Sequence, residues 1–370
     1  MTATAAATLP DMATVDTKRD WRPVLRRLLI GAPALWLLFV VVHLLVSGRV
    51  WWWRPADLVP PPAFLVIPVL LALAAVPCRR SRRPAAVLAA GALAIGTSLA
   101  GVNATGMLTG GGPVPPGALR VVAWNTGYWH EAGETADFYD LLRAQHADVY
   151  LLQEYLNYPA DVPVRIDEVD RLRAELPGYD IAVAGELVTL SRYPIVDQRA
   201  LDAPGAPPPP ADTDFPEFWR HKALRTDLRV GDGVLSVYNV HVTTPIWIGG
   251  PGPLSRSFWD TIRDLDAERG PHLRALAADV STNDGPVLVV GDMNTTPAMG
   301  ERQAFPAGLR DAAAASGAPY LASWPADGSF PRWWRLDWAL VSPGMTVHRY
   351  DFVDPAGLSD HRLQFLAVSP

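Results

Sequence analysis

The chain has 370 residues, of which 49% are hydrophobic and 19% are charged, and Cys78 is its single cysteine. This composition excludes an intrinsically disordered chain, and one cysteine excludes an intrachain disulfide framework. Residues 1–119 hold 11 Lys and Arg against 4 Asp and Glu, whereas residues 120–370 hold 21 against 34, so the net charge of −6 divides into +7 and −13. Such asymmetry predicts a basic membrane or nucleic-acid element followed by a separate acidic domain.

Three uncharged stretches in the first third of the chain predict membrane-spanning helices. They cover residues 28–48, 58–77 and 84–106, and about 20 apolar residues cross ~30 Å of hydrocarbon. Prolines at positions 60–62 and 68 shorten the regular part of the second stretch. A cleaved signal peptide is the alternative interpretation of the first stretch, but its apolar segment is long and the cleavage pattern near its end is weak.

The positive charges around these stretches predict their orientation. Five basic residues precede the first stretch, and four arginines at 79, 80, 82 and 83 separate the second from the third. The intervening loop has only Arg49 and Arg54, beside the tryptophans at 51–53, which are typical of an interfacial aromatic belt. The positive-inside rule therefore predicts a cytoplasmic N-terminus and a C-terminal domain outside the membrane.

These observations predict four segments and a multi-pass protein of the cell membrane. They are a cytoplasmic N-terminal tail (1–27), a three-helix membrane anchor (28–106), a Gly/Pro-rich linker (107–118) and an extracytoplasmic domain (119–370). Arginine outnumbers lysine 30 to 2, which is typical of coding bias in a GC-rich bacterial genome.

Residues 119–370 alternate short apolar runs with helix-like stretches, which predicts an α/β or α+β fold. The predicted strands cover 119–124, 149–152, 181–190, 233–242, 286–290, 336–341 and 364–368. The predicted helices cover 135–146, 166–176, 258–280 and 305–315, and the proline-rich stretch 203–215 is a predicted surface loop.

Polar residues follow the apolar strands at the points where the strands end. Asn125 ends the first strand, Glu154 follows the second, and the pairs Asn239/His241 and Asp292/Asn294 end two later strands. Asp337 lies in a further strand and Asp360-His361 precedes the last one. Carboxylates, amides and histidines at strand ends are how α/β folds assemble a site at one edge of a sheet.

Seven ordered stretches resemble the endonuclease/exonuclease/phosphatase superfamily of Mg²⁺-dependent phosphoesterases. They are VVAWN (121–125), DVYLLQE (148–154), LSRYP (190–194), YNVH (238–241), GDMN (291–294), LDWALVS (336–342) and SDH (359–361). The resemblance implies a four-layer α/β sandwich, in which two packed mixed sheets are flanked by helices. It also implies a metal-dependent phosphoric-ester hydrolase.

The resemblance assigns roles to the strand-end residues. It implies that Glu154, Asn125 and Asp360 bind Mg²⁺, with Mn²⁺ as a substitute, and oxygen ligands of this kind suit that ion. Asp292 resembles the catalytic aspartate of the family, with Asn294 as its phosphate-orienting partner. His361 would stabilise charge on the phosphoryl oxygens, and Asp337 would fix its tautomer. His241 and Asn239 would supply further phosphate contacts.

Each of these residues, taken alone, also has a purely structural interpretation. Asn125 and Asn239 suit strand ends or turns, Asp292 suits a turn or an N-cap, and a lone histidine is usually structural. The ordered set favours the enzyme. Either Asp292 or the His361–Asp337 pair activates the attacking water. Arg192 and Tyr193 are interpreted as structural.

The predicted substrate is a phosphorylated lipid or small molecule. A charge of −13 disfavours duplex nucleic acid, because phosphate neutralisation dominates the affinity of duplex-binding proteins. Trp333 and Trp334 precede the Asp337 strand, and residues 246–248 follow His241; these apolar residues either contact a lipid tail or pack in the core.

The predicted architecture also resembles actinomycete membrane phosphatases of the VanJ teicoplanin-resistance type, which would imply a polyprenyl pyrophosphate substrate. Two alternatives from other classes are an extracytoplasmic nuclease on the same fold and a non-catalytic membrane receptor or scaffold. The sequence leaves the oligomeric state open.

Overall fold

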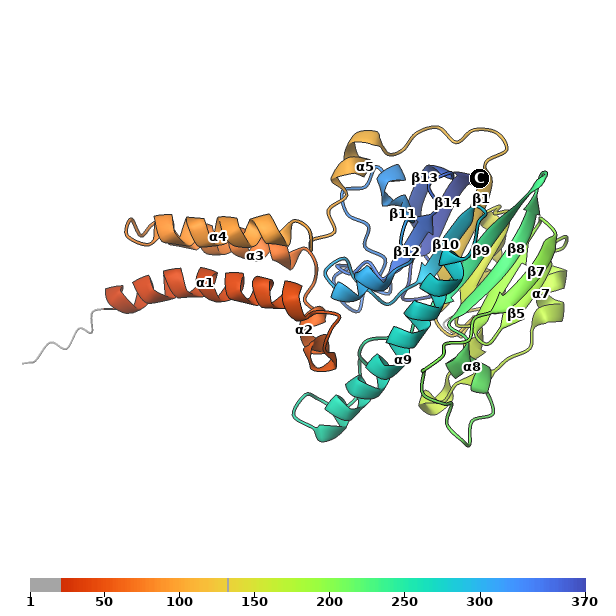
Figure 1. The fold of residues 1–370 in the computed structure, drawn as a ribbon, viewed down its shortest axis with the longest axis horizontal. Coiled ribbons are helices and arrows are strands. Elements are labelled where there is room, and N and C mark those ends of the chain that lie inside the picture. Colours follow the sequence, from red (N-terminus) through yellow and green to blue (C-terminus); the bar gives the residue numbers. More distant parts are fainter. Residues whose placement is uncertain (1–20, 132) are drawn as a thin grey trace, which may run out of the picture.

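The computed structural model describes residues 21–131 and 133–370, and most of the predicted cytoplasmic tail, residues 1–20, lies outside the described residues. A bundle of the helices α1, α3 and α4 projects from one end of a mixed α/β domain (Figure 1). The first helices are α1 (Arg22–Val46), η1 (Trp51–Trp53), α2 (Arg54–Asp57), α3 (Ala63–Ala75), α4 (Arg82–Gly96) and α5 (Ala104–Thr109).

Only α1, among the described helices, is long and apolar enough to cross a membrane, so the prediction of three spanning helices was wrong. At 1.5 Å per residue, α1 is ~38 Å long, whereas α3 and α4 are ~20 and ~23 Å. Helix α3 starts only after the prolines at 60–62 and stops before Pro77. Helix α4 ends where the hydroxyls of Thr97 and Ser98 donate to backbone carbonyls three residues earlier.

The bundle exposes large apolar side chains along its length. The most exposed are Leu28 (62%), Leu35 (67%), Leu73 (59%) and Val87 (72%). Because a water-soluble helix bundle turns such residues inward, this outer surface is typical of helices that lie in lipid.

The α/β domain is built on two six-stranded mixed sheets. The first has the order β13-β14-β1-β2-β6-β5 and the second the order β11-β12-β10-β9-β8-β7, and a two-stranded sheet pairs β3 with β4. Strands β1 and β2 are parallel, as are β9 and β10, and the other pairs are antiparallel. The strands are β1 (Leu119–Asn125), β2 (Val149–Gln153), β3 (Leu156–Asn157), β4 (Val164–Arg165), β5 (Asp180–Ala184), β6 (Leu187–Ser191), β7 (Ile195–Ala200), β8 (Ala223–Val230), β9 (Gly233–His241), β10 (Val287–Asp292), β11 (Arg310–Asp311), β12 (Asp337–Val341), β13 (Thr346–Val353) and β14 (Leu363–Ser369).

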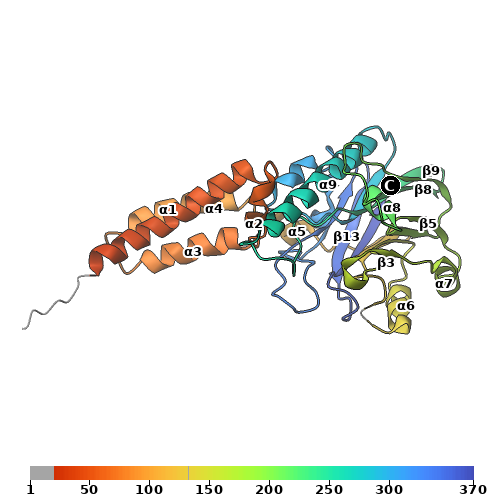
Figure 2. The same ribbon diagram turned by 90° about the horizontal axis from the view of Figure 1, so that it is seen from below.

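Alternating side chains of the central strands form three apolar layers. Val121 and Leu151 of the first sheet meet Val237 and Val290 of the second between the sheets. The opposite faces are covered by helices: α6 (Thr135–Ala144) and α7 (Val169–Glu175) cover the first sheet, and α9 (Arg256–Ser281) covers the second (Figure 2). The remaining short helices are η2 (Pro159–Asp161), α8 (Pro216–Arg220), η3 (Gly300–Ala304) and η4 (Ala312–Ala315). A mixed α/β fold with two large sheets is confirmed.

Two predicted elements of this domain were wrong. Residues 181–190 form two strands rather than one, because Gly185, at φ +57°, turns the chain back between β5 and β6. Residues 305–315 do not form one α-helix, because Pro306 and Gly308 interrupt the helical pattern. The segment instead forms the short strand β11 and the short 3₁₀ helix η4.

Candidate active site

Strand register brings the predicted site residues to one edge of the paired sheets. Asp292 at the end of β10 lies opposite His241 of parallel β9 and opposite Asp337 of antiparallel β12. Asn125 ends β1 in the other sheet, and Glu154 follows β2 beside it. The site therefore forms where the ends of five strands from both sheets meet.

Asn125 and Glu154 form the part of the site contributed by the first sheet. The Asn125 Nδ2 donates to Glu154 Oε1 at 2.9 Å and to Asp292 Oδ2 at 3.1 Å, and so joins the two sheets. The Tyr128 backbone N–H donates to Glu154 Oε2 at 2.9 Å. Glu154 has φ +61°, a left-handed conformation that costs energy for a residue with a side chain and is common at functional sites.

Asp292 is fully buried and lies at the centre of the predicted site residues that meet at this edge, which we call the polar cluster. Its Oδ1 accepts from the Asn294 backbone N–H at 2.8 Å, and its Oδ2 accepts from Asn294 Nδ2 at 3.2 Å. Both imidazoles approach the same Oδ2: His361 Nε2 at 3.5 Å and His241 Nε2 at 3.7 Å. The arrangement holds one carboxylate rigidly between two potential proton donors.

His361 and Asp337 form a buried pair. His361 Nδ1 lies 2.9 Å from Asp337 Oδ2, and the Asp337 backbone N–H donates to Ser323 Oγ. Burial alone would lower the pKa of His361, but the carboxylates of Asp337 and Asp292 raise it well above its usual range. The raised pKa favours the imidazolium form, in which the Nε2–H can donate to an anion.

His241 has a second carboxylate partner, Glu186, which the sequence analysis missed. His241 Nδ1 lies 3.0 Å from Glu186 Oε2, and the ammonium of Lys222 pairs with Oε1 of the same carboxylate. Burial opposes both charges, but His241 and Lys222 lower the pKa of Glu186 to about 2, and Glu186 raises the pKa of His241 to about 9. The Gly185–Glu186 dipeptide was a turn signal inside the run 181–190, which had been interpreted as one strand.

Replacing Glu186 with glutamine is expected to destabilise the fold by about 3 kcal/mol, because it leaves Lys222 and His241 buried without their carboxylate. The lowered pKa of Glu186 gives stability that is present above about pH 4.5 and lost toward pH 2. The raised pKa of His241 gives stability that is present below pH 6.5 and lost as the pH rises through about 9.

Denaturation of the full chain in detergent from pH 5 to pH 10 measures this effect. The destabilisation should be largest near pH 5.5 and smaller at pH 10. Glu217→Gln is the matched control, because Glu217 pairs with Arg165 at an exposed site, where the loss should be at most about 1 kcal/mol. An equal loss for Glu186→Gln at both ends of the pH range would contradict the assigned charges.

Asp360 lies at the edge of the cluster, and Asn239 does not join it. The Trp324 Nε1 donates to Asp360 Oδ2 at 2.8 Å, and Asp360 is close enough for its charge to raise the pKa of Glu154, after the larger effect of burial. Asn239 is fully buried between the sheets, where its Nδ2 donates to the carbonyls of Leu152 and Val188 and its Oδ1 accepts from Gln153. The prediction that Asn239 contacts the substrate is therefore corrected, because its amide is fully used by the packing of the two sheets.

The donors present fit a divalent metal ion. Burial and the nearby acidic groups raise the pKa of Glu154, and His241 Nε2 lies 3.8 Å from its Oε1. A carboxylate that is only 15% exposed, beside Asp360 and Asn125, is therefore an oxygen-rich position that a cation would stabilise. One ligand atom each of Asp292, Asp337 and His361 also lies within 4.8 Å of the others, so these residues are a second group that could hold a metal ion.

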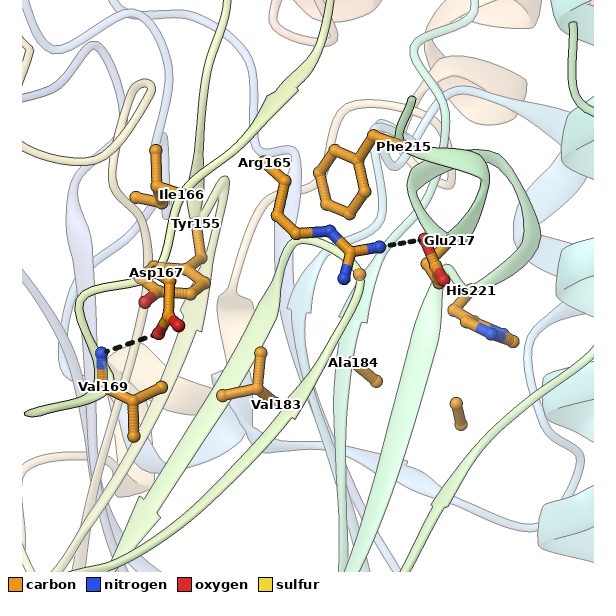
Figure 3. A pocket seen from close by; sticks show the side chains of 12 residues that line it. Tyr155, Arg165, Ile166, Asp167, Val169, Val183, Ala184, Phe215, Glu217 and His221 are labelled. Carbon is orange, nitrogen blue, oxygen red and sulfur yellow. Dashed lines mark hydrogen bonds and ion pairs between the residues drawn. The ribbon is translucent and has the colours of Figure 1, made fainter. Parts of the chain in front are cut away.

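A cavity of about 420 Å³ adjoins the site on the side of β5 and α8. Its lining includes Tyr155 and Gly185, the sequence neighbours of Glu154 and Glu186. The Arg165 guanidinium pairs with Glu217 across it (Figure 3). Among the described residues, none of the predicted site residues lines this cavity. The candidate active site is therefore the polar cluster and not this cavity.

Comparisons with known proteins agree with this arrangement. A sequence profile of the Endonuclease/Exonuclease/phosphatase family matches residues 122–361, a range that includes every site side chain described above. No curated protein matches the sequence.

Similar solved structures include an endonuclease/exonuclease/phosphatase from Bacteroides vulgatus, at 15% identity and a TM-score of 0.47, covering 68% of this chain and 98% of that one. A mannosyl-6-phosphatase from Bacteroides thetaiotaomicron has 14% identity and a TM-score of 0.47, with 68% and 100% covered. Sphingomyelinase C from Streptomyces griseocarneus has 19% identity and a TM-score of 0.44, with 68% and 99% covered.

Proposed function

The chain belongs to the endonuclease/exonuclease/phosphatase family and is a phosphoester hydrolase, and from this premise we propose that it is a membrane-anchored, Mg²⁺-dependent enzyme that hydrolyses the phosphate of a membrane lipid outside the cytoplasm. One observation carries the lipid assignment. The polar cluster is flanked by two rows of aromatic side chains that end in exposed apolar loops, near the residues 51–58 that follow α1.

The chemistry follows from the geometry of the cluster. Mg²⁺, or Mn²⁺ in its place, is the ion we propose for Glu154, Asp360 and Asn125, where it would neutralise charge on the phosphoryl group and the leaving oxygen. Asp292 accepts a proton from water as the water oxygen forms the new P–O bond and the bond to the leaving oxygen breaks. His361, oriented by Asp337, acts as a donor to the phosphoryl oxygens with His241 and Asn294, and Asp292 acts as the base.

The first aromatic row leads from Glu154 to an exposed loop. Tyr128, whose backbone binds Glu154, stacks on Tyr158 with ring centroids 5.0 Å apart, and Tyr158 lies 6.3 Å from Trp247. Ile248 is 57% exposed, and Leu254 of the same loop is fully exposed. This row offers an apolar surface that begins at the metal-binding position.

The second aromatic row leads from Asp360 in the same way. Trp324, which donates to Asp360, lies 5.6 Å from Trp334, and Trp333 follows at 6.1 Å. Trp333 and Phe330 are about half exposed. Hence Trp333 presents apolar surface to solvent, in agreement with the lipid-facing alternative and not with packing in the core.

Both rows end next to the membrane anchor. Trp334 Nε1 donates to the Leu58 carbonyl at 3.0 Å, and Trp51 contacts Trp259 at the start of α9 with ring centroids 6.4 Å apart. In Figure 2 the loop that leads into α9 lies beside α2, where the helix bundle meets the domain. An amphiphile whose phosphate reaches the polar cluster would keep its apolar part on these loops and in the bilayer.

We propose that α1 spans the membrane with its N-terminal end in the cytoplasm and the hairpin of α3 and α4 packed along it. Arg26 of α1 lies close enough to Cys78, between α3 and α4, to add to the effect of the Ser81 hydroxyl in lowering the pKa of that thiol. The arginines at 22, 26 and 27 and those at 79–83 therefore lie at the end of the bundle far from the domain (Figure 1), and positive charge favours the cytoplasmic side.

Nucleic acid is a weaker candidate substrate. Two arginines precede the Asp337 strand: Arg335 is buried and pairs with both oxygens of Asp311 at 2.7 Å, whereas Arg332 is exposed. A duplex-binding enzyme needs several free cations along its groove. The lipid that we propose to test first is a polyprenyl pyrophosphate, which the resemblance to VanJ-type phosphatases implies.

The double variant Ile248→Ser, Leu254→Ser tests the lipid assignment. With Mg²⁺, we expect kcat/KM for a polyprenyl pyrophosphate in vesicles to fall about tenfold, since removing one apolar contact with lipid costs about 1.4 kcal/mol or more. Hydrolysis of soluble p-nitrophenyl phosphate should not change. Val234→Ser, 41% exposed at the start of β9 and so far from the site, is the control. Equal losses on the two substrates would refute the lipid-contact role of the loop.

A further inference from the structure

Arg54, in the turn that follows α1, is buried in a network of charges between the anchor and the α/β domain. Its side chain is 4% exposed. It binds Asp266 of α9 with Nε at 2.8 Å, Glu301 of η3 with Nη2 at 2.5 Å and Asp57 with Nη1 at 3.4 Å. Buried charges are costly unless they are paired, so this network stabilises one orientation of the anchor on the domain.

The network continues from Glu301 into the loop that carries Asn294. Glu301 Oε2 accepts from Arg269 Nη2 at 2.8 Å. The fully buried Arg269 also donates to the Asn294 carbonyl at 3.1 Å, to Thr295 Oγ1 at 3.0 Å and to the Thr243 carbonyl. Two buried arginines and one glutamate therefore connect the anchor to a residue of the polar cluster.

Side chains at the end of α1 and just after it also contact the backbone of the same loop. His43 Nε2 lies 3.0 Å from the Ala298 carbonyl, and the Gly300 N–H donates to Ser47 Oγ at 2.8 Å. A Cβ at Gly300 would collide with the Ser47 carbonyl, so only glycine permits this approach. Ser47 Oγ in turn donates to Asp57 at 2.6 Å, which links both sets of contacts.

The loop needs this support because Asn294 is held in an unfavourable conformation. Asn294 has φ +46°, and that conformation directs its backbone N–H and its Nδ2 to the two oxygens of Asp292. Left-handed backbone at a residue with a side chain persists only where the surroundings determine it. Arg269 on the Asn294 carbonyl is one such determinant, and Arg54 reaches Arg269 through Glu301.

We propose that Ser47, Arg54 and Asp57 are part of the scaffold of the catalytic centre, with Arg54 as a positioning residue that acts through Glu301 and Arg269 on Asn294 and Asp292. The activity readout of this inference rests on the proposed phosphoester hydrolysis. The anchor then does more than hold the enzyme at the membrane: its exit turn is required for turnover of any substrate, soluble ones included.

The test uses the full chain in detergent with Mg²⁺ and soluble p-nitrophenyl phosphate, so that lipid contact plays no part. Arg54→Met should lower kcat at least tenfold and change KM less than twofold, because substrate contacts remain and only Asp292 and Asn294 lose their alignment. Arg49→Met is the matched control, an exposed arginine in the same segment, and should keep wild-type kcat. Full kcat in Arg54→Met would overturn the proposal.

Two further measurements separate positioning from general loss of stability and from failure of the proposed function. Ala89→Gly, at a buried position of α4 inside the helix bundle, should lower the melting temperature but keep kcat well below that temperature. Hydrogen exchange of the amides at 293–301 should rise in Arg54→Met and not in Arg49→Met, whatever the substrate. Unchanged exchange at 293–301 overturns the inference by itself, whereas a wild type without hydrolytic activity counts against the proposed function alone.

Discussion

Replacing Asp292 with asparagine is expected to lower kcat about 10³-fold while the fold remains intact. The carboxylate is fully buried and receives the N–H of Asn294 and the amides of Asn125 and Asn294. An asparagine of the same shape keeps much of this packing but accepts no proton from water, and general base catalysis contributes about 10²–10⁴-fold.

The measurement is phosphate release by the full chain at saturating substrate and Mg²⁺. Asp284→Asn is the matched control, because Asp284 is exposed just before the same strand, β10. If Asp292→Asn kept more than about a tenth of the wild-type kcat, water activation would pass to another group, and the assignment of Asp292 as the base would be wrong.

Replacing Glu154 with glutamine is expected to abolish Mg²⁺-dependent activity and also to stabilise the metal-free protein. Burial, and then the charges of Asp360 and Glu186, raise the pKa of Glu154. A raised carboxylate pKa reduces the stability of the metal-free fold as the pH rises through that value. A neutral side chain removes this effect at pH 7, so the melting temperature without metal should increase.

Thermal denaturation with and without Mg²⁺ measures both effects. The wild type should be stabilised by Mg²⁺ in proportion to its concentration above the dissociation constant. Glu154→Gln should lose this response, whereas Glu131→Gln, an exposed glutamate near the same edge, should retain it. A Glu154→Gln variant that Mg²⁺ stabilises like the wild type would exclude Glu154 as the principal ligand.

The polar cluster was largely predictable because strand ends are visible in a sequence. Asn125, Glu154 and Asp292 each follow a buried apolar strand, and parallel neighbours bring such positions to one edge. His361 was found through the resemblance of its SDH stretch, and its contact with Asp337 now gives that pairing a distance of 2.9 Å. Which roles these residues perform remains a prediction for the variants above.

Contacts between distant segments were not predictable. Glu186 follows a turn glycine inside an apolar run, and only the packing of β6 near β9 places it against His241. Asn239 has the same strand-end context as Asn125, but its amide faces the other sheet. Arg54 looked like a loop arginine in a membrane protein, since nothing near it in the sequence indicates Asp266 or Glu301, more than 200 residues away.

The helix bundle shows the limit of hydropathy as a guide. Uncharged length predicted three spans, but prolines and hydroxyl groups shorten α3 and α4, and only α1 retains the length of a bilayer crossing. The sequence also indicated a Gly/Pro-rich linker over 107–118, but the last residues of α5 occupy its start. Just before α5, the Asn103 side chain donates to the carbonyls of Ala313 and Ser316. The helix bundle is therefore fixed to the domain in the turn after α1 and again after α4.

The most direct measurement is release of inorganic phosphate from a polyprenyl pyrophosphate by the purified full chain in lipid vesicles. We expect release in the presence of Mg²⁺, none in excess chelator, and at most about a thousandth of the wild-type rate for Asp292→Asn. Absence of release by the wild type, together with Mg²⁺-dependent cleavage of duplex DNA by the same preparation, would contradict the lipid phosphatase and favour a nuclease on this fold.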